Sequence, residues 1–191
     1  MAAYARAAST SRRSPLAALL ETERLRLVPW ANGHAELLVR LSAMPEVMRF
    51  VGPGDLWSRE DAVRRSRQVR AHWREHKFGW RAAVERESGR PVGFIALNLL
   101  GEGMPELAAD ELEIGWWLDP ACAGRGYATE GAAAVRDEAL ASRGAESVIA
   151  RIQPGNAASI AVAERIGLAL ERETTGVYGE PVLVYRGPPA P

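Results

Sequence analysis

Residues 111–130 read ELEIGWWLDPACAGRGYATE, and this order predicts a strand, a turn that contains glycine, and the start of a helix. Strand-forming residues fill positions 111–118. Gly124 and Gly126 then open a helix that we expect to run to about Ala141. This strand, turn and helix are the starting point for assigning the other elements of the domain.

The glycine turn predicts a binding site for an anion. The first main-chain N–H groups of a helix have no partner within the helix, and its dipole places partial positive charge there. Gly124 and Gly126 let a ligand approach the main chain closely, and Arg125 adds a full charge. A purely structural connection between a strand and a helix remains the alternative.

Two common nucleotide-binding motifs do not fit this turn. The dinucleotide fingerprint G-x-G-x-x-G requires a glycine at position 129, where the chain has Thr129. The P-loop requires a lysine after its last glycine, and the sole lysine of the chain is Lys77.

The remaining elements favour a mixed sheet. We expect strands at 23–30, 79–85, 91–100, 147–152, 168–174 and 182–185, and helices at 32–42, 58–77 and 156–166. Because helices interrupt a series of hairpins, we predict an α/β (α+β) fold with one mixed, mostly antiparallel sheet flanked by helices. The domain should span 21–187, between a disordered leader at 1–20 and a tail at 188–191.

Composition narrows the classes of partner. The chain has 191 residues, of which 47% are hydrophobic, as expected for one domain. Its 24 basic and 24 acidic residues give no net positive field for nucleic acid or a membrane surface. A single cysteine and no cluster with zinc spacing predict no metal and a cytoplasmic setting.

The motifs resemble those of the GNAT superfamily of acyl-coenzyme A dependent N-acetyltransferases. The pyrophosphate loop of that superfamily reads Gln/Arg-x-x-Gly-x-Gly/Ala, and this chain departs from it in having Ala121 at the first position. Residues 124–130 look like the version found in Rim-type ribosomal-protein N-terminal acetyltransferases. A second block, NAASIAVAERIGL at 156–168, resembles a later helix of the superfamily.

This resemblance implies that acetyl-coenzyme A is the co-substrate. The residues expected to hold it are Trp116, Trp117, Leu118, Gly124, Arg125, Gly126, Tyr127, Ala128, Thr129 and Asn156. Because neighbouring strand residues face opposite ways, one of the two tryptophans should enter the core and the other should line the pantetheine channel.

The reaction implied is direct attack of a primary amine on the acetyl thioester in a ternary complex. Glu113 matches the glutamate base of several family members, and Glu111 projects from the same strand face. Two neighbouring carboxylates would raise the pKa of one of them, which suits a base. A solvated pair of charges at a sheet edge is the alternative. The oxyanion donor should be a main-chain N–H near Trp116 or Trp117.

Ser159 is the second expected catalytic residue. Many family members have a tyrosine seven residues after the asparagine, where this chain has Ala163, and in the Rim-type group a serine at the position of Ser159 is thought to protonate the leaving thiolate. A serine one turn into a helix also commonly faces solvent or bonds back to the main chain.

The acceptor is the least determined part of the function. The Rim-type resemblance favours a protein N-terminal α-amine, while aminoglycosides, polyamines and amino acids remain alternatives, as does a silent acyl-coenzyme A sensor. Acidic Glu102, Glu106 and Asp110 favour a cationic acceptor. The sequence is compatible with a monomer or a homodimer.

Overall fold

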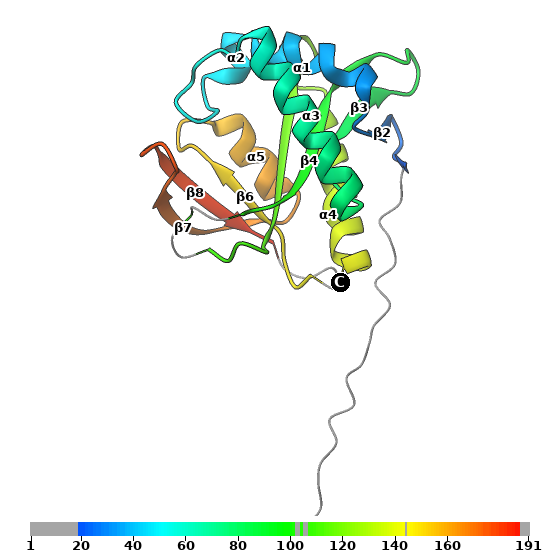
Figure 1. The fold of residues 1–191 in the computed structure, drawn as a ribbon. Helices are drawn as coiled ribbons and strands as arrows, with labels where there is room; N and C mark the ends of the chain where they lie inside the picture. Colours follow the sequence, from blue (N-terminus) through cyan, green and yellow to red (C-terminus); the bar gives the residue numbers. More distant parts are fainter. Residues whose placement is uncertain (1–18, 102–103, 105–106, 144, 188–191) are drawn as a thin grey trace, which may run out of the picture.

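The computed structural model describes residues 19–101, 104, 107–143 and 145–187 (Figure 1). The tail at 188–191 and nearly all of the expected leader lie outside this range, as do Glu102 and Glu106. The strands are β1 (Leu20–Glu21), β2 (Leu25–Pro29), β3 (Arg81–Glu85), β4 (Pro91–Leu99), β5 (Leu112–Leu118), β6 (Ile149–Ile152), β7 (Ala169–Thr175) and β8 (Pro181–Arg186). The helices are η1 (Asn32–His34), α1 (Ala35–Ser42), α2 (Pro45–Met48), α3 (Arg59–His76), η2 (Pro120–Cys122), α4 (Tyr127–Arg143) and α5 (Ala157–Arg165).

The strands form one sheet in the order β1-β2-β3-β4-β5-β6-β8-β7. Neighbours pair antiparallel except β5 and β6, which are parallel. The predicted fold class is therefore confirmed. Three short elements, β1, α2 and η2, were not predicted, because two to four residues are too few to set up a periodic pattern.

Helices cover both faces of the sheet (Figure 1). Side chains of the central strand β4 alternate between two hydrophobic clusters. Phe94 and Ala96 belong to the cluster with α1 and α3, and Ile95 and Leu97 belong to the cluster with α4 and α5. Because both faces are covered, β4 is buried from position 92 to 97.

Local signals define α3 as the sequence predicted. The hydroxyl of Ser58 accepts a hydrogen bond from the main-chain N–H of Asp61 at 3.1 Å, which caps the start of the helix. Lys77 ends it in a left-handed conformation, with φ 62.

A buried ion pair holds α4 against the sheet. Arg81 of β3 lies 2.8 Å from the carboxylate of Glu138 of α4, and the two side chains are 0% and 8% exposed. Burial lowers the pKa of Arg81, an effect that the charge of Glu138 opposes. Because an unpaired buried charge is costly, this ion pair favours a single position of α4 on the sheet. α4 is the helix that follows the glycine turn.

The close approach of β4 and β5 generates a test of the fold. A Cβ atom added at Gly93 would lie 2.2 Å from the carbonyl oxygen of Trp117 and 2.8 Å from Cα of Leu118. We therefore expect Gly93→Ala to lower the free energy of unfolding by about 3 kcal/mol, measured by urea denaturation. The control is Gly33→Ala, where no atom lies within 4 Å, and it should change little. Equal effects of the two substitutions would contradict this packing.

Candidate active site

The turn between β5 and α4 presents six consecutive main-chain donors. Gly124 and Gly126 adopt left-handed conformations, with φ 74 and 78. Within the described ranges, no atom accepts a hydrogen bond from the N–H groups of residues 124–129. A Cβ added at Gly124 would meet nothing within 4 Å, so the space beside the turn is open. Two left-handed glycines, one residue apart and just ahead of a helix N-terminus, form a concave site suited to an anion.

Asp119 fixes the start of this turn. Its Oδ1 atom accepts a hydrogen bond from the main-chain N–H of Ala121 at 3.0 Å, and its other oxygen is paired with Arg40 of α1. Burial raises the pKa of Asp119, but the bond from Ala121 and the charge of Arg40 outweigh it and hold that pKa below its usual value. The turn is therefore tied to α1 through the residue that precedes Pro120.

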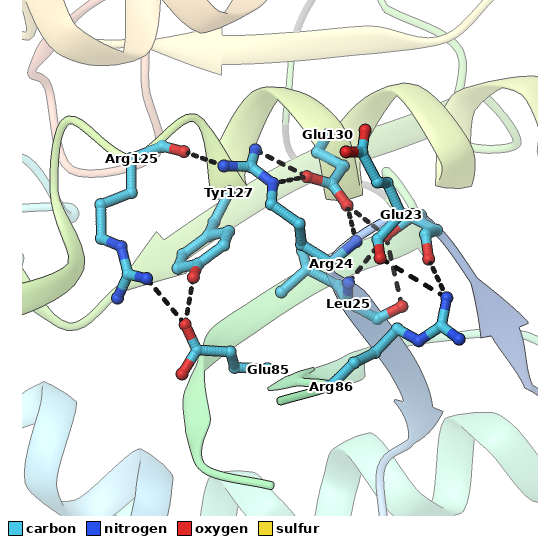
Figure 2. Close-up of polar contacts among 9 residues, drawn as sticks. Glu23, Arg24, Leu25, Glu85, Arg86, Arg125, Tyr127 and Glu130 are labelled. Atoms are coloured by element: carbon cyan, nitrogen blue, oxygen red, sulfur yellow. Dashed lines mark hydrogen bonds and ion pairs between the residues drawn. The ribbon is translucent and has the colours of Figure 1, made fainter. Parts of the chain in front are cut away.

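Arg125 does not reach the open space beside the turn. Its guanidinium lies 2.8 Å from the carboxylate of Glu85, and the hydroxyl of Tyr127 donates to the same carboxylate (Figure 2). Hydrogen bonds from Ser88 and Tyr127 keep the pKa of Glu85 below its usual value. The charge that Arg125 was expected to add to the anion site is therefore largely neutralised by β3.

Arg24 is the arginine that lies across the turn. Its Nη1 atom donates to the carbonyl of Arg125 at 2.8 Å, and its Nε atom donates to Glu130 at 2.7 Å (Figure 2). A Cβ added at Gly126 would lie 3.3 Å from Nη2 of Arg24. The sequence analysis missed this residue, which is 101 positions from Arg125 and follows no local pattern.

A split in the sheet continues the site away from the turn. The parallel strands β5 and β6 pair only at Glu113 and Ile149. Beyond this point they separate, and the main chain of β5 is bonded on its β4 side alone.

The phase of the β4–β5 ladder shows which groups of β5 face the split. Leu100 donates to Glu111 at 2.9 Å, and Asp119 donates to Val92 at 2.8 Å. Because bonds alternate along an antiparallel pair, the N–H groups of Trp116 and Leu118 point away from β4 and into the split.

A cavity of about 1580 Å³ joins the turn, the split and α5. It brings together all of the predicted site residues except Arg125: Glu113, Trp116, Trp117, Leu118, Gly124, Gly126, Tyr127, Ala128, Thr129, Asn156 and Ser159. The two sequence blocks therefore meet in one site, although the second block begins 26 positions after the first block ends.

The two tryptophans pack on opposite sides of the sheet, as the alternation predicted. Trp116 contacts the cluster of α4 and α5, and Trp117 contacts the cluster of α1 and α3. The ring of Trp117 lies 5.5 Å from that of Trp57 and 5.2 Å from that of Phe94. Both tryptophans line the cavity, so neither is confined to the core.

Glu113 and Glu111 do not form the repelling pair that the sequence suggested. Glu113 accepts hydrogen bonds from Nε and Nη2 of Arg151 at 2.8 and 3.0 Å. Glu111 lies 2.6 Å from Arg186 and does not line the cavity. Each carboxylate faces an arginine from β6 or β8, and these long-range partners were invisible to an argument based on strand alternation.

Arg151 therefore belongs to the site. Burial lowers the pKa of Arg151, but the charge of Glu113 and the bonds to it raise that pKa above its usual value. The side chains of Arg151 and Glu113 are 27% and 17% exposed. A carboxylate held by an arginine fork is fixed in orientation.

Asn156 and Ser159 lie together at the start of α5. The Oδ1 atom of Asn156 caps the helix by accepting a bond from the N–H of Ser159 at 3.1 Å. This leaves the amide nitrogen of Asn156 for a ligand. In the part of the chain that the structure describes, the hydroxyl of Ser159 bonds to no main-chain carbonyl.

The far end of the cavity is formed by two segments that the sequence analysis did not assign to the site. Gln153 donates to the carbonyl of Gly52 at 2.7 Å, which ties the segment after α2 to the end of β6. A Cβ at Gly52 would lie 3.1 Å from the ring of Tyr178 in the β7–β8 hairpin. Val177 and Tyr178 line the cavity while 56% and 70% exposed.

Two negative findings concern the described residues. They contain no group of three or more His, Cys, Asp or Glu placed to hold a metal ion. Among the helices of this part of the chain, none has the length and apolar character needed to cross a membrane.

Comparison with known proteins gives a consistent family. A model of the acetyltransferase (GNAT) domain matches residues 24–169. The FsC-acetyl coenzyme A-N(2)-transacetylase of Aspergillus fumigatus is 31% identical over 160 residues, which cover 78% of this chain and 64% of that protein. The chain thus spans less than two thirds of the length of the curated relatives it matches.

Solved structures agree. An acetyltransferase from Agrobacterium tumefaciens has 32% identity and a TM-score of 0.74, covering 88% of this chain and 92% of that one. The ribosomal L7/L12 alpha-N-protein acetyltransferase RimL, in complex with coenzyme A, has 17% identity and a TM-score of 0.71, covering 89% and 97%. At that identity the likeness to RimL concerns the fold alone.

The geometry of the turn predicts which substitutions weaken binding of acetyl-coenzyme A. Arg125→Ala should raise the Kd about threefold or less in calorimetry, because Arg125 is half exposed and paired with Glu85. Gly124→Val should raise it at least about 30-fold, because a β-branched residue resists a φ of 74 and would fill the open space. If Arg125→Ala abolished binding while Gly124→Val left it unchanged, a site made of main-chain donors would be contradicted.

Proposed function

The chain belongs to the GNAT acetyltransferase family, and we propose that it transfers the acetyl group of acetyl-coenzyme A to a primary amine by direct attack in a ternary complex. The observation that carries this proposal is the row of six free N–H groups at 124–129, which opens into the split between β5 and β6. A pyrophosphate needs many donors and little space, and this turn offers both.

The remaining residues of the cavity suit the rest of the coenzyme. The pantetheine arm carries amide groups, and the free main-chain groups of β5 and the amide of Asn156 are their partners in this proposal. Trp116 and Leu118 also line this part of the cavity. The coenzyme supplies a thioester, whose carbonyl carbon is the electrophile.

Three groups are proposed to act in the chemical step. The N–H of Trp116, which points into the split, stabilises the oxyanion that forms when the amine nitrogen bonds to the carbonyl carbon. Glu113 takes the proton that the amine loses, through a water molecule. Ser159 donates a proton to the sulfur as the bond between carbon and sulfur breaks, and solvent returns a proton to the Ser159 oxygen. Cys122 lines the cavity but is only 2% exposed, and direct transfer needs no nucleophile from the protein.

Arg151 shapes the role of Glu113 in this proposal. Its two bonds fix the carboxylate in one orientation, which favours proton transfer. An α-amine has a pKa of about 8, so a modest base is sufficient near neutral pH.

We propose a protein N-terminal α-amine as the acceptor. The support is the far end of the cavity, where Val177 and Tyr178 line the wall and remain largely exposed. Exposed apolar side chains at the mouth of a site suit an acceptor that continues outside it, as a polypeptide does. The fold is also that of RimL, which is named for an alpha-N-protein acceptor.

A small-molecule amine is the second candidate. It is favoured by the relative at 31% identity, whose name specifies transfer to an N(2) position of FsC. The two candidate acceptors differ in their contact with Tyr178. A small amine would be enclosed by the cavity and would gain little binding energy from this exposed side chain.

An acceptor panel tests the proposal. Peptides with a free N-terminus, the same peptides with a blocked N-terminus, and small amines are compared by release of the coenzyme thiol. We expect turnover of the peptides with a free N-terminus and of no other acceptor in the panel. We expect Tyr178→Ala to raise the KM for these peptides. Exclusive turnover of a small amine would overturn the peptide assignment. Binding of acetyl-coenzyme A without transfer to any amine would indicate a sensor instead.

Removing the proposed base should have a pH-dependent effect. Glu113→Gln should lower kcat by about 100-fold at pH 7, with nearly unchanged affinity for acetyl-coenzyme A. The deficit should shrink as the pH rises above the pKa of the acceptor amine, because the amine then arrives neutral and a base contributes less to the rate.

The matched control is Glu111→Gln. It also removes a carboxylate from an arginine, but Glu111 does not line the cavity, so kcat should stay within about twofold. Near-normal turnover of Glu113→Gln at neutral pH, or an equal loss in the control, would remove Glu113 from this role.

A further inference from the structure

We propose that Arg24 is a positioning residue for the coenzyme, which keeps the glycine turn in the conformation that binds pyrophosphate. This inference rests on the proposed function and concerns a residue outside both sequence blocks. Arg24 lies in the segment between β1 and β2, and it lines the cavity beside the turn. Figure 2 shows its guanidinium bonded to both Glu130 and Arg125.

Glu130, on the first turn of α4, holds Arg24 at two points. One carboxylate oxygen accepts from the main-chain N–H of Arg24 at 2.7 Å, and also from the hydroxyl of Thr22 at 2.5 Å. The other oxygen lies 2.7 Å from both Nε and Nη2 of the guanidinium. Because main chain and side chain are both held, Arg24 has little freedom to leave α4.

From this position Arg24 fixes one peptide unit of the turn. Its Nη1 atom donates to the carbonyl oxygen of Arg125 at 2.8 Å. In a planar trans peptide the carbonyl and the next N–H point in opposite directions, so the N–H of Gly126 points away from the guanidinium. Gly126, on one side of this peptide, has no Cβ atom to oppose a flip, and a flip would present an oxygen to the anion in place of a donor.

Arg24 also offsets a charge that opposes anion binding. The carboxylate of Glu130 is 15% exposed and lies one turn from the free N–H groups. Burial raises the pKa of Glu130, but the bonds from Thr22 and Arg24 hold that pKa below its usual value, so the group stays ionised. Without Arg24, an uncompensated negative charge would lie beside the phosphate site.

The contrast with Arg125 sharpens the inference. Arg125 belongs to the glycine motif, but its guanidinium is paired with Glu85 and the cavity does not include it. The two guanidinium groups lie 4.9 and 4.7 Å from the ring centroid of Tyr127, that of Arg24 being the first. Of these two arginine side chains, only that of Arg24 bonds to the main chain of the turn within the described residues.

The test compares two acetyl donors. Acetyl-pantetheine carries the same thioester as acetyl-coenzyme A but has no phosphate, so it does not use the turn. We expect Arg24→Gln to raise the Kd for acetyl-coenzyme A at least tenfold in calorimetry and to raise its KM while kcat changes less than twofold. The kcat/KM with acetyl-pantetheine should stay within twofold of the wild type.

Two further variants separate position from charge. Arg26→Gln is the control, because Arg26 is an exposed arginine two residues away that does not line the cavity, and it should behave as wild type. The double variant Arg24→Gln with Glu130→Gln should recover part of the affinity, since the repelling charge is gone, but remain weaker than wild type because the Arg125 carbonyl has lost its donor.

The outcomes distinguish this inference from the proposed function. Wild-type affinity in Arg24→Gln, or equal losses with both donors, would overturn the role of Arg24 and leave the proposed function standing. A wild-type protein that binds no acetyl-coenzyme A would overturn the proposed function and the role of Arg24 with it.

Discussion

The separation of β5 from β6 is the constraint on which the site depends. The two parallel strands are bonded at Glu113 and Ile149 alone, and from there the free edge of β5 faces a cavity in place of a neighbouring strand. Unpaired main-chain groups inside a protein are costly, so a split of this kind persists only where something else satisfies them. The amide groups of a pantetheine arm do so in the proposed complex. On its other edge β5 is stabilised by β4, which is buried on both faces and paired along its length with β5.

The turn that follows β5 is held from outside by residues distant in the sequence. Arg40 pairs with Asp119 before the turn, Glu85 takes Arg125 and Tyr127, and Arg24 with Glu130 secures the start of α4. These contacts use side chains on the outer side, which leaves the N–H groups of residues 124–129 free. A turn rich in glycine would otherwise sample many conformations, so the charged contacts supply the order that the glycines lack.

The sequence predicted the order of the long elements, the topology class and eleven of the residues that line the cavity, because helix periodicity, caps and glycine turns are local signals. The same kind of reasoning failed for charge partners. Glu113 and Glu111 were expected to repel each other, but each faces an arginine, from β6 and β8 respectively. Arg125 was expected at the anion site, and its guanidinium is paired with Glu85 outside the cavity lining. Arg24, which was not considered, lines the cavity. Such pairings join residues 38 to 106 positions apart, and no periodic pattern encodes them.

The most direct measurement of the central claim, that the N–H groups of residues 124–129 hold the phosphates of acetyl-coenzyme A, is a titration followed by ¹H–¹⁵N NMR. With acetyl-coenzyme A, the amide resonances of these residues should show the largest shifts in the chain. With acetyl-pantetheine, the shifts should move to β5, around Trp116 and Leu118, and those of the turn should nearly vanish. Turn resonances that ignore acetyl-coenzyme A, or that respond equally to both donors, would contradict the account.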